Sequence, residues 1–235
     1  GGRYNMPMAI YAISALHLSL SGQKPMHVFG EPWRDHDRRI AANWDAMVQP
    51  EDTVLICGDI SWATRFEQAR EDLAYIAERP GRKVMIRGNH DYWWRREATN
   101  RLQRQMHESI HLMHGHSLLI EGCAVTGTRG WRLELEDDPD AGDEKVLRRE
   151  LMYLERGLQE LDEAGRKRIV MLHYPPFNAD LAPNDFADLL QAYDVDIVVY
   201  GHVHTGYYLE GDYNGIQLRL VSVDHTDFRP VLIAE

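Results

Sequence analysis

The segment DIVVYGHVH, residues 196–204, joins a wholly apolar run to two histidines spaced two positions apart. The apolar run predicts a buried strand. Because residues i and i+2 of a strand project to the same side, we expect His202 and His204 to point together. Two neutral imidazoles on one short segment are suited to binding metal ions.

Four other apolar segments run into a turn that carries metal-binding types of side chain. They lie at residues 10–17, 53–59, 83–91 and 169–173. Five such segments in chain order indicate one common site, because open α/β sheets bind ligands at the carboxyl ends of their strands. The thirty positions between Asp59 and Asn89 fit one strand–helix–strand unit. Its crossover brings both residues to the same sheet edge.

The composition is that of a globular protein, with 235 residues, 44% hydrophobic and 27% charged. We treat residues 6–235 as one domain and set residues 1–5, before Met6, aside as a candidate cloning remnant. The net charge of −11 disfavours a partner such as long nucleic acid, which needs a basic face. It permits a small phosphorylated substrate held through bound cations.

No apolar run approaches the length of a membrane span, and the opening residues show no secretion signal, so we expect no membrane partner. Cys57 and Cys123 are interpreted as buried free thiols in a reducing cytoplasm. The sequence leaves the oligomeric state open.

Periodic apolar residues predict helices at 33–48, 66–77 and 147–161. Prolines predict a loop at 174–184, and acidic residues another at 134–144. After residue 206 the chain reads as antiparallel hairpins with turns at 211–212 and 214–215. The predicted fold class is α/β, a layered sandwich with strands inside and helices outside.

Five motifs carry a family resemblance: SALH at 14–17, GD at 58–59, GNHD at 88–91, His173, and GHVH at 201–204. In order and spacing they resemble the motif series of calcineurin-like metallophosphoesterases, over roughly residues 10–204. The resemblance implies a four-layer αββα sandwich with mixed central sheets, as a single metallophosphoesterase-like domain. It also implies two metal ions at the carboxyl edge of those sheets. The implied ligands are His17 and His204 for the first ion, Asn89, His173 and His202 for the second, and Asp59 for both.

Such ligands favour two divalent ions of Mn, Fe or Zn over calcium. Two cations would generate a metal-bridging hydroxide and neutralise the phosphoryl oxygens. His90 is the candidate catalytic residue, stabilising the transition state or protonating the leaving group. Asp91 is expected either to orient His90 or to cap a helix that begins near Tyr92.

Three residues are candidate substrate contacts. Asn89 would contact the substrate in addition to binding metal. Arg129 lies in a glycine-flanked turn, where a guanidinium can fork onto phosphate, although an ordinary surface arginine is the alternative. His225 follows the last motif and is either a substrate contact or part of a plain turn. The aromatic run at 92–94 either stacks on a base or, more commonly for tryptophan, packs in the core.

One position departs from the family pattern, which has Asp where this chain has Ala15. A methyl group cannot bind metal, so we expect the first metal site to be weakened by at least the ~10–100-fold that losses around a ligand shell cause. Because the remaining motif residues are intact, we interpret Ala15 as an introduced substitution that impairs a competent hydrolase.

The favoured function is a dimetal-dependent phosphodiesterase that hydrolyses a small or nucleotide-like phosphoester. A phosphomonoesterase or phosphoprotein phosphatase remains an alternative. Another is a non-catalytic binding or scaffold protein on the same fold, which Ala15 favours and which His90 and the complete second ligand set disfavour.

Overall fold

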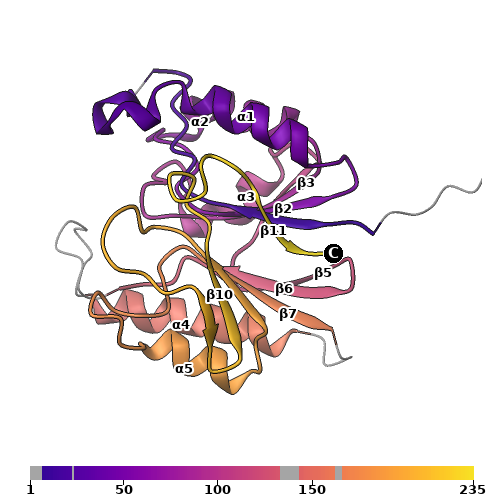
Figure 1. Ribbon diagram of the computed structural model, residues 1–235, viewed down its shortest axis with the longest axis vertical. Helices are drawn as coiled ribbons and strands as arrows, with labels where there is room; N and C mark the ends of the chain where they lie inside the picture. The colour runs from indigo at the N-terminus through magenta and orange to yellow at the C-terminus, as the bar shows by residue number, and fades with distance from the viewer. Residues whose placement is uncertain (1–6, 23, 133–142, 162–165) are drawn as a thin grey trace, which may run out of the picture.

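Two mixed β-sheets lie face to face, with helices covering their outer faces (Figure 1). The computed structural model describes residues 7–22, 24–132, 143–161 and 166–235. In spatial order, the first sheet contains β11 (Val231–Ala234), β1 (Ile10–Ile13), β2 (Thr53–Cys57), β3 (Arg82–Ile86) and β4 (Ile110–Leu112). The second contains β5 (Ser117–Ile120), β6 (Cys123–Thr128), β7 (Lys167–Leu172), β8 (Ile197–Tyr200), β10 (Ile216–Leu220) and β9 (Gly211–Tyr213).

Parallel pairing runs through the middle of each sheet. Strands β1 to β4 are parallel, as are β6, β7, β8 and β10. The sheet edges β11, β5 and β9 are antiparallel to their neighbours, so both sheets are mixed. The unit β2–α2–β3 brings Asp59 and Asn89 to the same edge, as the sequence predicted.

Helices α1 (His36–Met47) and α2 (Phe66–Glu78) cover the first sheet, and α4 (Glu144–Gln159) and α5 (Asp185–Ala192) cover the second. Each pair forms a core with its own sheet: Trp44 and Ile76 belong to one cluster, Leu154 and Phe186 to another. A third cluster of strand residues, including Leu55 and Met171, lies between the sheets. The four-layer αββα sandwich is therefore confirmed.

The remaining short elements are η1 (Met26–Phe29), η2 (Glu31–Trp33), η3 (Arg96–Ala98) and α3 (Thr99–Gln103). The prediction of a helix that begins near Tyr92 is wrong, because the chain forms irregular turns there before η3. Cys57 and Cys123 are free and buried, as expected. Across the described ranges, we find no helix both long and apolar enough to traverse a bilayer.

The C-terminal part agrees only in part with the predicted hairpins. Asn214 and Gly215 have positive φ values of 49° and 89° and connect β9 to β10, as a tight hairpin turn requires. Residues 211–212, predicted as a turn, instead lie in β9.

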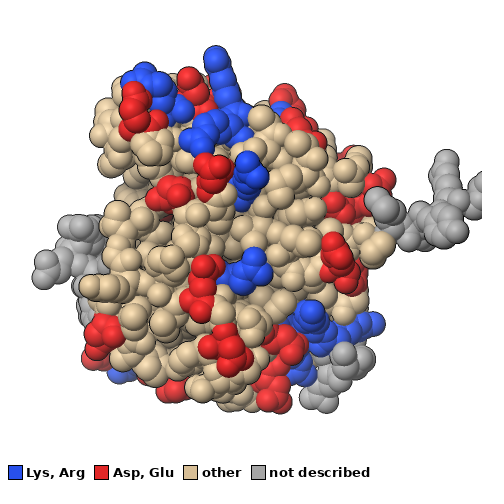
Figure 2. Space-filling model, in the orientation of Figure 1, with Lys and Arg blue, Asp and Glu red and all other residues tan. Residues whose placement is uncertain are grey.

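Most of the predicted acidic loop lies outside the described residues. Acidic and basic side chains are intermixed on the face shown in Figure 2.

Candidate metal centre

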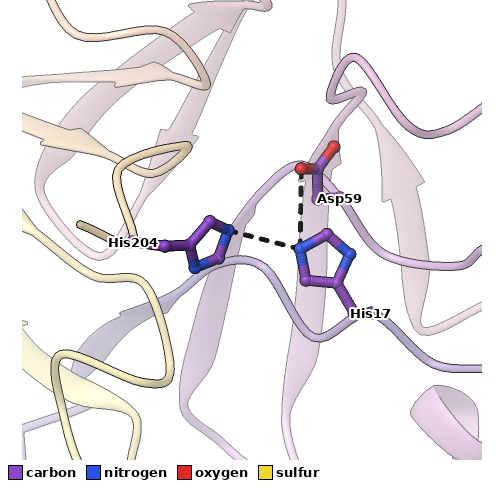
Figure 3. Close-up of side chains that lie close together, drawn as sticks. All are labelled: His17, Asp59 and His204. Carbon is purple, nitrogen blue, oxygen red and sulfur yellow. Dashed lines mark hydrogen bonds and ion pairs between the residues drawn. The ribbon is translucent and has the colours of Figure 1, made fainter. Parts of the chain in front are cut away.

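The side chains that follow the predicted strands meet at one place. His17, Asp59 and His204 form one group, and Asp59, His173 and His202 form a second. Within each group the potential ligand atoms lie within 4.8 Å of one another. Figure 3 shows His17, Asp59 and His204 pointing toward a common centre. Asp59 is shared, so the two groups are adjacent.

The distances inside the groups fit metal coordination better than direct hydrogen bonding. Asp59 Oδ2 lies 3.7 Å from His17 Nε2, whereas Asp59 Oδ1 lies 3.5 Å from His173 Nε2. His17 Nε2 and His204 Nε2 are 3.4 Å apart. Two ligand atoms held tetrahedrally at ~2.1 Å from one ion would lie ~3.4 Å apart. The carboxylate presents one oxygen to each group, as a bridging ligand does.

Asn89 completes the second group. Its Oδ1 lies 2.7 Å from His173 Nε2 and 3.2 Å from His202 Nδ1. An amide oxygen, a carboxylate oxygen and two imidazole nitrogens therefore face one another. This donor set fits a divalent ion such as Mn, Fe or Zn.

Burial controls the charge of these groups. It lowers the pKa of His17 to about 3, although Asp59 opposes the shift, and it also lowers the pKa of His173 and His202. Burial would raise the pKa of Asp59, but the neighbouring histidines, His173 foremost, hold that pKa below its usual range. Neutral imidazoles beside an ionised carboxylate are the protonation states that bind cations.

Partners behind the rings fix two of the tautomers. His173 Nδ1 donates to the carbonyl oxygen of Cys57 at 2.9 Å, which leaves Nε2 free to face the centre. His204 Nδ1 lies 3.0 Å from both carboxylate oxygens of Asp224. Burial lowers the pKa of His204, but the hydrogen bond and charge of Asp224 raise it on balance. Asp224 was not predicted from the sequence, in which its place beside His225 is its only signal.

The backbone at the centre is bent into the left-handed region. Ala15, His17, Asp59 and His202 have φ values of 57°, 44°, 53° and 66°. Non-glycine residues adopt this conformation rarely, and each costs about 1–3 kcal/mol. The extended-strand explanation for the 202–204 pair is wrong, because β8 ends at Tyr200 and His202 turns the chain. That turn delivers His202 to the second group and His204 to the first.

Asp91 has neither of its expected roles. Its Oδ1 accepts hydrogen bonds from the backbone of Ile60 and Ser61 and from Trp93 Nε1, at 2.9–3.1 Å. Its Oδ2 accepts one from the backbone of Gly88 at 2.7 Å. Burial, aided by the charge of Asp59, raises the pKa of Asp91 to about 6. Asp91 therefore fastens the loop after β2 to the loop after β3.

His90 lies beside the first group. Its backbone N–H donates to Asp59 Oδ1 at 3.0 Å, and its ring centroid is 5.8 Å from that of His17. The imidazole Nδ1 lies 3.3 Å from the Tyr92 hydroxyl. His90 is partly exposed, so a bound molecule can reach it. Its catalytic role stays a prediction.

The other two candidate substrate contacts lie in different surroundings. Arg129 is only 5% exposed and approaches Glu150 Oε1 at 3.8 Å, with its guanidinium over Trp131. His225 Nε2 lies 3.1 Å from Glu210 Oε2. Neither residue is among the two ligand groups. Their substrate contacts therefore remain predictions that these neighbours do not support.

Two phage proteins are similar in sequence to part of this chain. A "Gene 66 protein" of Mycobacterium phage L5 is 38% identical over 78 residues, which are 33% of this chain and 37% of that protein. A "Gene 66 protein" of Mycobacterium phage D29 is 47% identical over 57 residues, which are 24% of this chain and 28% of that protein. The chain thus spans less than two-fifths of the length of either relative.

Solved structures share the fold. Phosphopantetheinyl hydrolase (PptH) from Mycobacterium tuberculosis superposes with a TM-score of 0.58 and 16% identity, over 92% of this chain and 89% of that one. A protein of unknown function from Aquifex aeolicus gives a TM-score of 0.52 and 19% identity, over 96% and 95%. The sequence profile of the family described as "Calcineurin-like phosphoesterase" matches residues 8–206, which contain every residue of both ligand groups. This chain belongs to the calcineurin-like phosphoesterase family.

Proposed function

We propose that the protein is a dimetal-dependent phosphoric ester hydrolase, specifically a phosphodiesterase for a small or nucleotide-like phosphoester. The observation that carries the proposal is the shared carboxylate of Asp59, which faces His17 with one oxygen and His173 with the other. When bound, two divalent ions, with manganese as our first choice, would supply an activated water and neutralise phosphoryl oxygens.

The chain's own residues have distinct tasks in this proposal. His17 and His204 hold the first ion, and Asn89, His173 and His202 hold the second. His90 would donate a hydrogen bond or a proton to the leaving oxygen, a role supported by its ring lying 5.8 Å from that of His17 and by its partial exposure. The buried free cysteines support a reducing, cytoplasmic setting.

Ala15 impairs the first metal site in this proposal. It is buried at φ 57°, and its N–H donates to the carbonyl oxygen of Gly58 at 3.0 Å. Asp tolerates left-handed backbone better than Ala does, so the local backbone suits the carboxylate that the family pattern has there. The complete second group should hold metal more tightly than the first.

The decisive experiment compares the chain with Ala15→Asp and Ala15→Gly. With added Mn²⁺, Ala15→Asp should bind the first ion at least ~10-fold more tightly and hydrolyse a member of a phosphodiester and phosphomonoester panel. Ala15→Gly relieves the left-handed strain without adding a ligand and should remain inactive. Equal, negligible turnover in all three forms would refute the proposed hydrolase activity. A metal-free and inert Ala15→Asp variant would instead support the scaffold alternative.

A further inference from the structure

A continuous row of contacts extends outward from the first ligand group. The Trp62 ring stacks on His17 at 4.9 Å and lies 4.6 Å from the ring of His90. Lys24 Nζ lies 3.8 Å from the Trp62 ring centroid and 5.1 Å from that of Phe29. On the other side, His90 contacts Tyr92. We call Phe29, Lys24, Trp62 and Tyr92 the aromatic strip.

The rings at the two ends of the aromatic strip face solvent. Phe29 is 54% exposed and Tyr92 is 55% exposed, whereas Trp93 and Trp94, beside Tyr92 in sequence, are buried. Val28, next to Phe29, is exposed as well. Exposed apolar side chains gathered beside a polar site are typical of a surface that binds a ligand. Base-sized aromatic groups stack on such rings without needing specific hydrogen bonds.

Lys24 adds a positive charge to this surface. Its ammonium group lies over two aromatic rings, and within the described ranges no carboxylate lies within ion-pair distance of it. A cation held over rings keeps its hydrogen-bond donors free for an anion. Because Trp62 contacts both Lys24 and His17, that anion would lie beside the metal centre but outside it.

We propose that the aromatic strip binds the leaving group of the substrate and that this leaving group is a nucleotide. Its base stacks on one of the two exposed end rings, Phe29 or Tyr92, and its own phosphate pairs with Lys24. The inference rests on the proposed function, since it requires the scissile phosphodiester at the metal centre. The resulting substrate class is a short oligonucleotide, down to a dinucleotide, whose second phosphate is recognised by the chain rather than by metal.

The test exploits the impaired turnover of the Ala15 chain, which permits binding measurements with intact ligands. A dinucleoside monophosphate is titrated in Mn²⁺ against the same molecule carrying a terminal phosphate on the leaving nucleoside, with tryptophan fluorescence and calorimetry as readouts. The extra phosphate should tighten binding at least about 10-fold, the range of a charge-assisted hydrogen bond. Lys24→Met should abolish that gain, and any loss in its affinity for the unphosphorylated dinucleotide should be much smaller.

The base is tested with a dinucleotide whose leaving nucleoside is abasic. The chain should bind it about 5-fold or more weakly than the complete dinucleotide, and Phe29→Ala or Tyr92→Ala should shrink that difference. Lys145→Met, on α4, and Leu119→Ala, on β5, remove an exposed cation and an exposed apolar side chain elsewhere and serve as matched controls.

Each result decides the inference separately from the proposed function. An extra phosphate that adds no affinity, or a Lys24→Met variant that weakens both dinucleotides equally, overturns the nucleotide leaving group. So does the absence of dinucleotide binding to a chain that holds Mn²⁺. In all these cases the turnover of Ala15→Asp remains a separate test of the proposed hydrolase activity, because that assay uses the whole phosphoester panel.

Discussion

Asp224 is the residue whose importance only the fold reveals. It lies in the segment after β10 and contacts His204 Nδ1 with both carboxylate oxygens at 3.0 Å. A carboxylate behind an imidazole orients the ring and strengthens the other nitrogen as a ligand. Asp224→Ala should therefore weaken binding of the first ion by about 10–100-fold, measured by Mn²⁺ titration of the Ala15→Asp form.

The control for this change is Asp227→Ala, which removes a nearby exposed carboxylate that pairs with Arg39. That variant should keep full metal affinity, because Asp227 has no contact with His204 among the described residues. Equal losses in the two variants would show that general negative charge, rather than orientation of His204, supports the ion.

A second residue-scale prediction concerns Asp91, whose two oxygens accept four hydrogen bonds. In Asp91→Asn, an amide NH₂ must face either the N–H of Gly88 or the three donors on the other side. We expect a loss of about 1–3 kcal/mol in the free energy of unfolding, since a buried donor loses its acceptor. Urea denaturation at neutral pH measures it; an unchanged midpoint would mean that Asp91 does not fasten the loops.

At the scale of elements, the contact of α4 with β6 depends on a residue without a side chain. A Cβ at Gly157 would overlap Thr126 Oγ1, which donates to the carbonyl oxygen of His116. In an open helix, Gly→Ala stabilises by about 1 kcal/mol. Here Gly157→Ala should instead destabilise by about 1–3 kcal/mol, because α4 must move away from the sheet.

A double-mutant cycle isolates this contact. In a Thr126→Ala background the obstructing hydroxyl is gone, and only the Cβ of residue 126 and the Gly115 backbone remain close, at 3.2 and 3.3 Å, so Gly157→Ala should be clearly less destabilising in urea denaturation. Equal destabilisation in both backgrounds would show that the Thr126 hydroxyl does not obstruct the helix as we infer.

The elements differed in how far the sequence predicted them. The apolar segment predicted at 53–59 begins where β2 begins, at Thr53, because a buried strand needs an uninterrupted apolar segment. Helix α5 was missed: it is eight residues long, follows a proline-containing loop, and begins at an Asn184 cap. Strand β11 pairs with β1 in the first sheet, whereas β10 lies in the second sheet. Local hairpin signals could not predict this pairing, because the two strands are far apart in the sequence.

At the scale of the whole molecule, the predicted ligands converged because their motifs depend on strand ends, which the sheet order brings to one edge. The residues that hold these ligands and their loops in place could not be predicted in the same way. The bonds of Asp91 and Asp224 join segments that are distant in sequence, or use side chains with no distinctive spacing. Trp62 and Lys24 were missed for the same reason, since only the folded chain places them beside His17.

The two ligand groups also join the two sheets. His17, Asp59 and Asn89 follow strands of the first sheet, and His173, His202 and His204 follow strands of the second. Each ion would therefore hold both sheets together, and unfolding would have to release it. Because an ion that binds only the folded state stabilises it by mass action, Mn²⁺ at 100 times its dissociation constant should add about 2.7 kcal/mol.

For a chain of this size that gain corresponds to a rise of roughly 5–10 °C in the midpoint of thermal unfolding, which a chelator should reverse. His202→Ala should lose most of the response, because it removes a ligand of the intact second group. His27→Ala, which removes an exposed histidine, should keep it. If bound Mn²⁺ leaves the midpoint unchanged, or stabilises His202→Ala equally, the ions do not join the sheets at these residues.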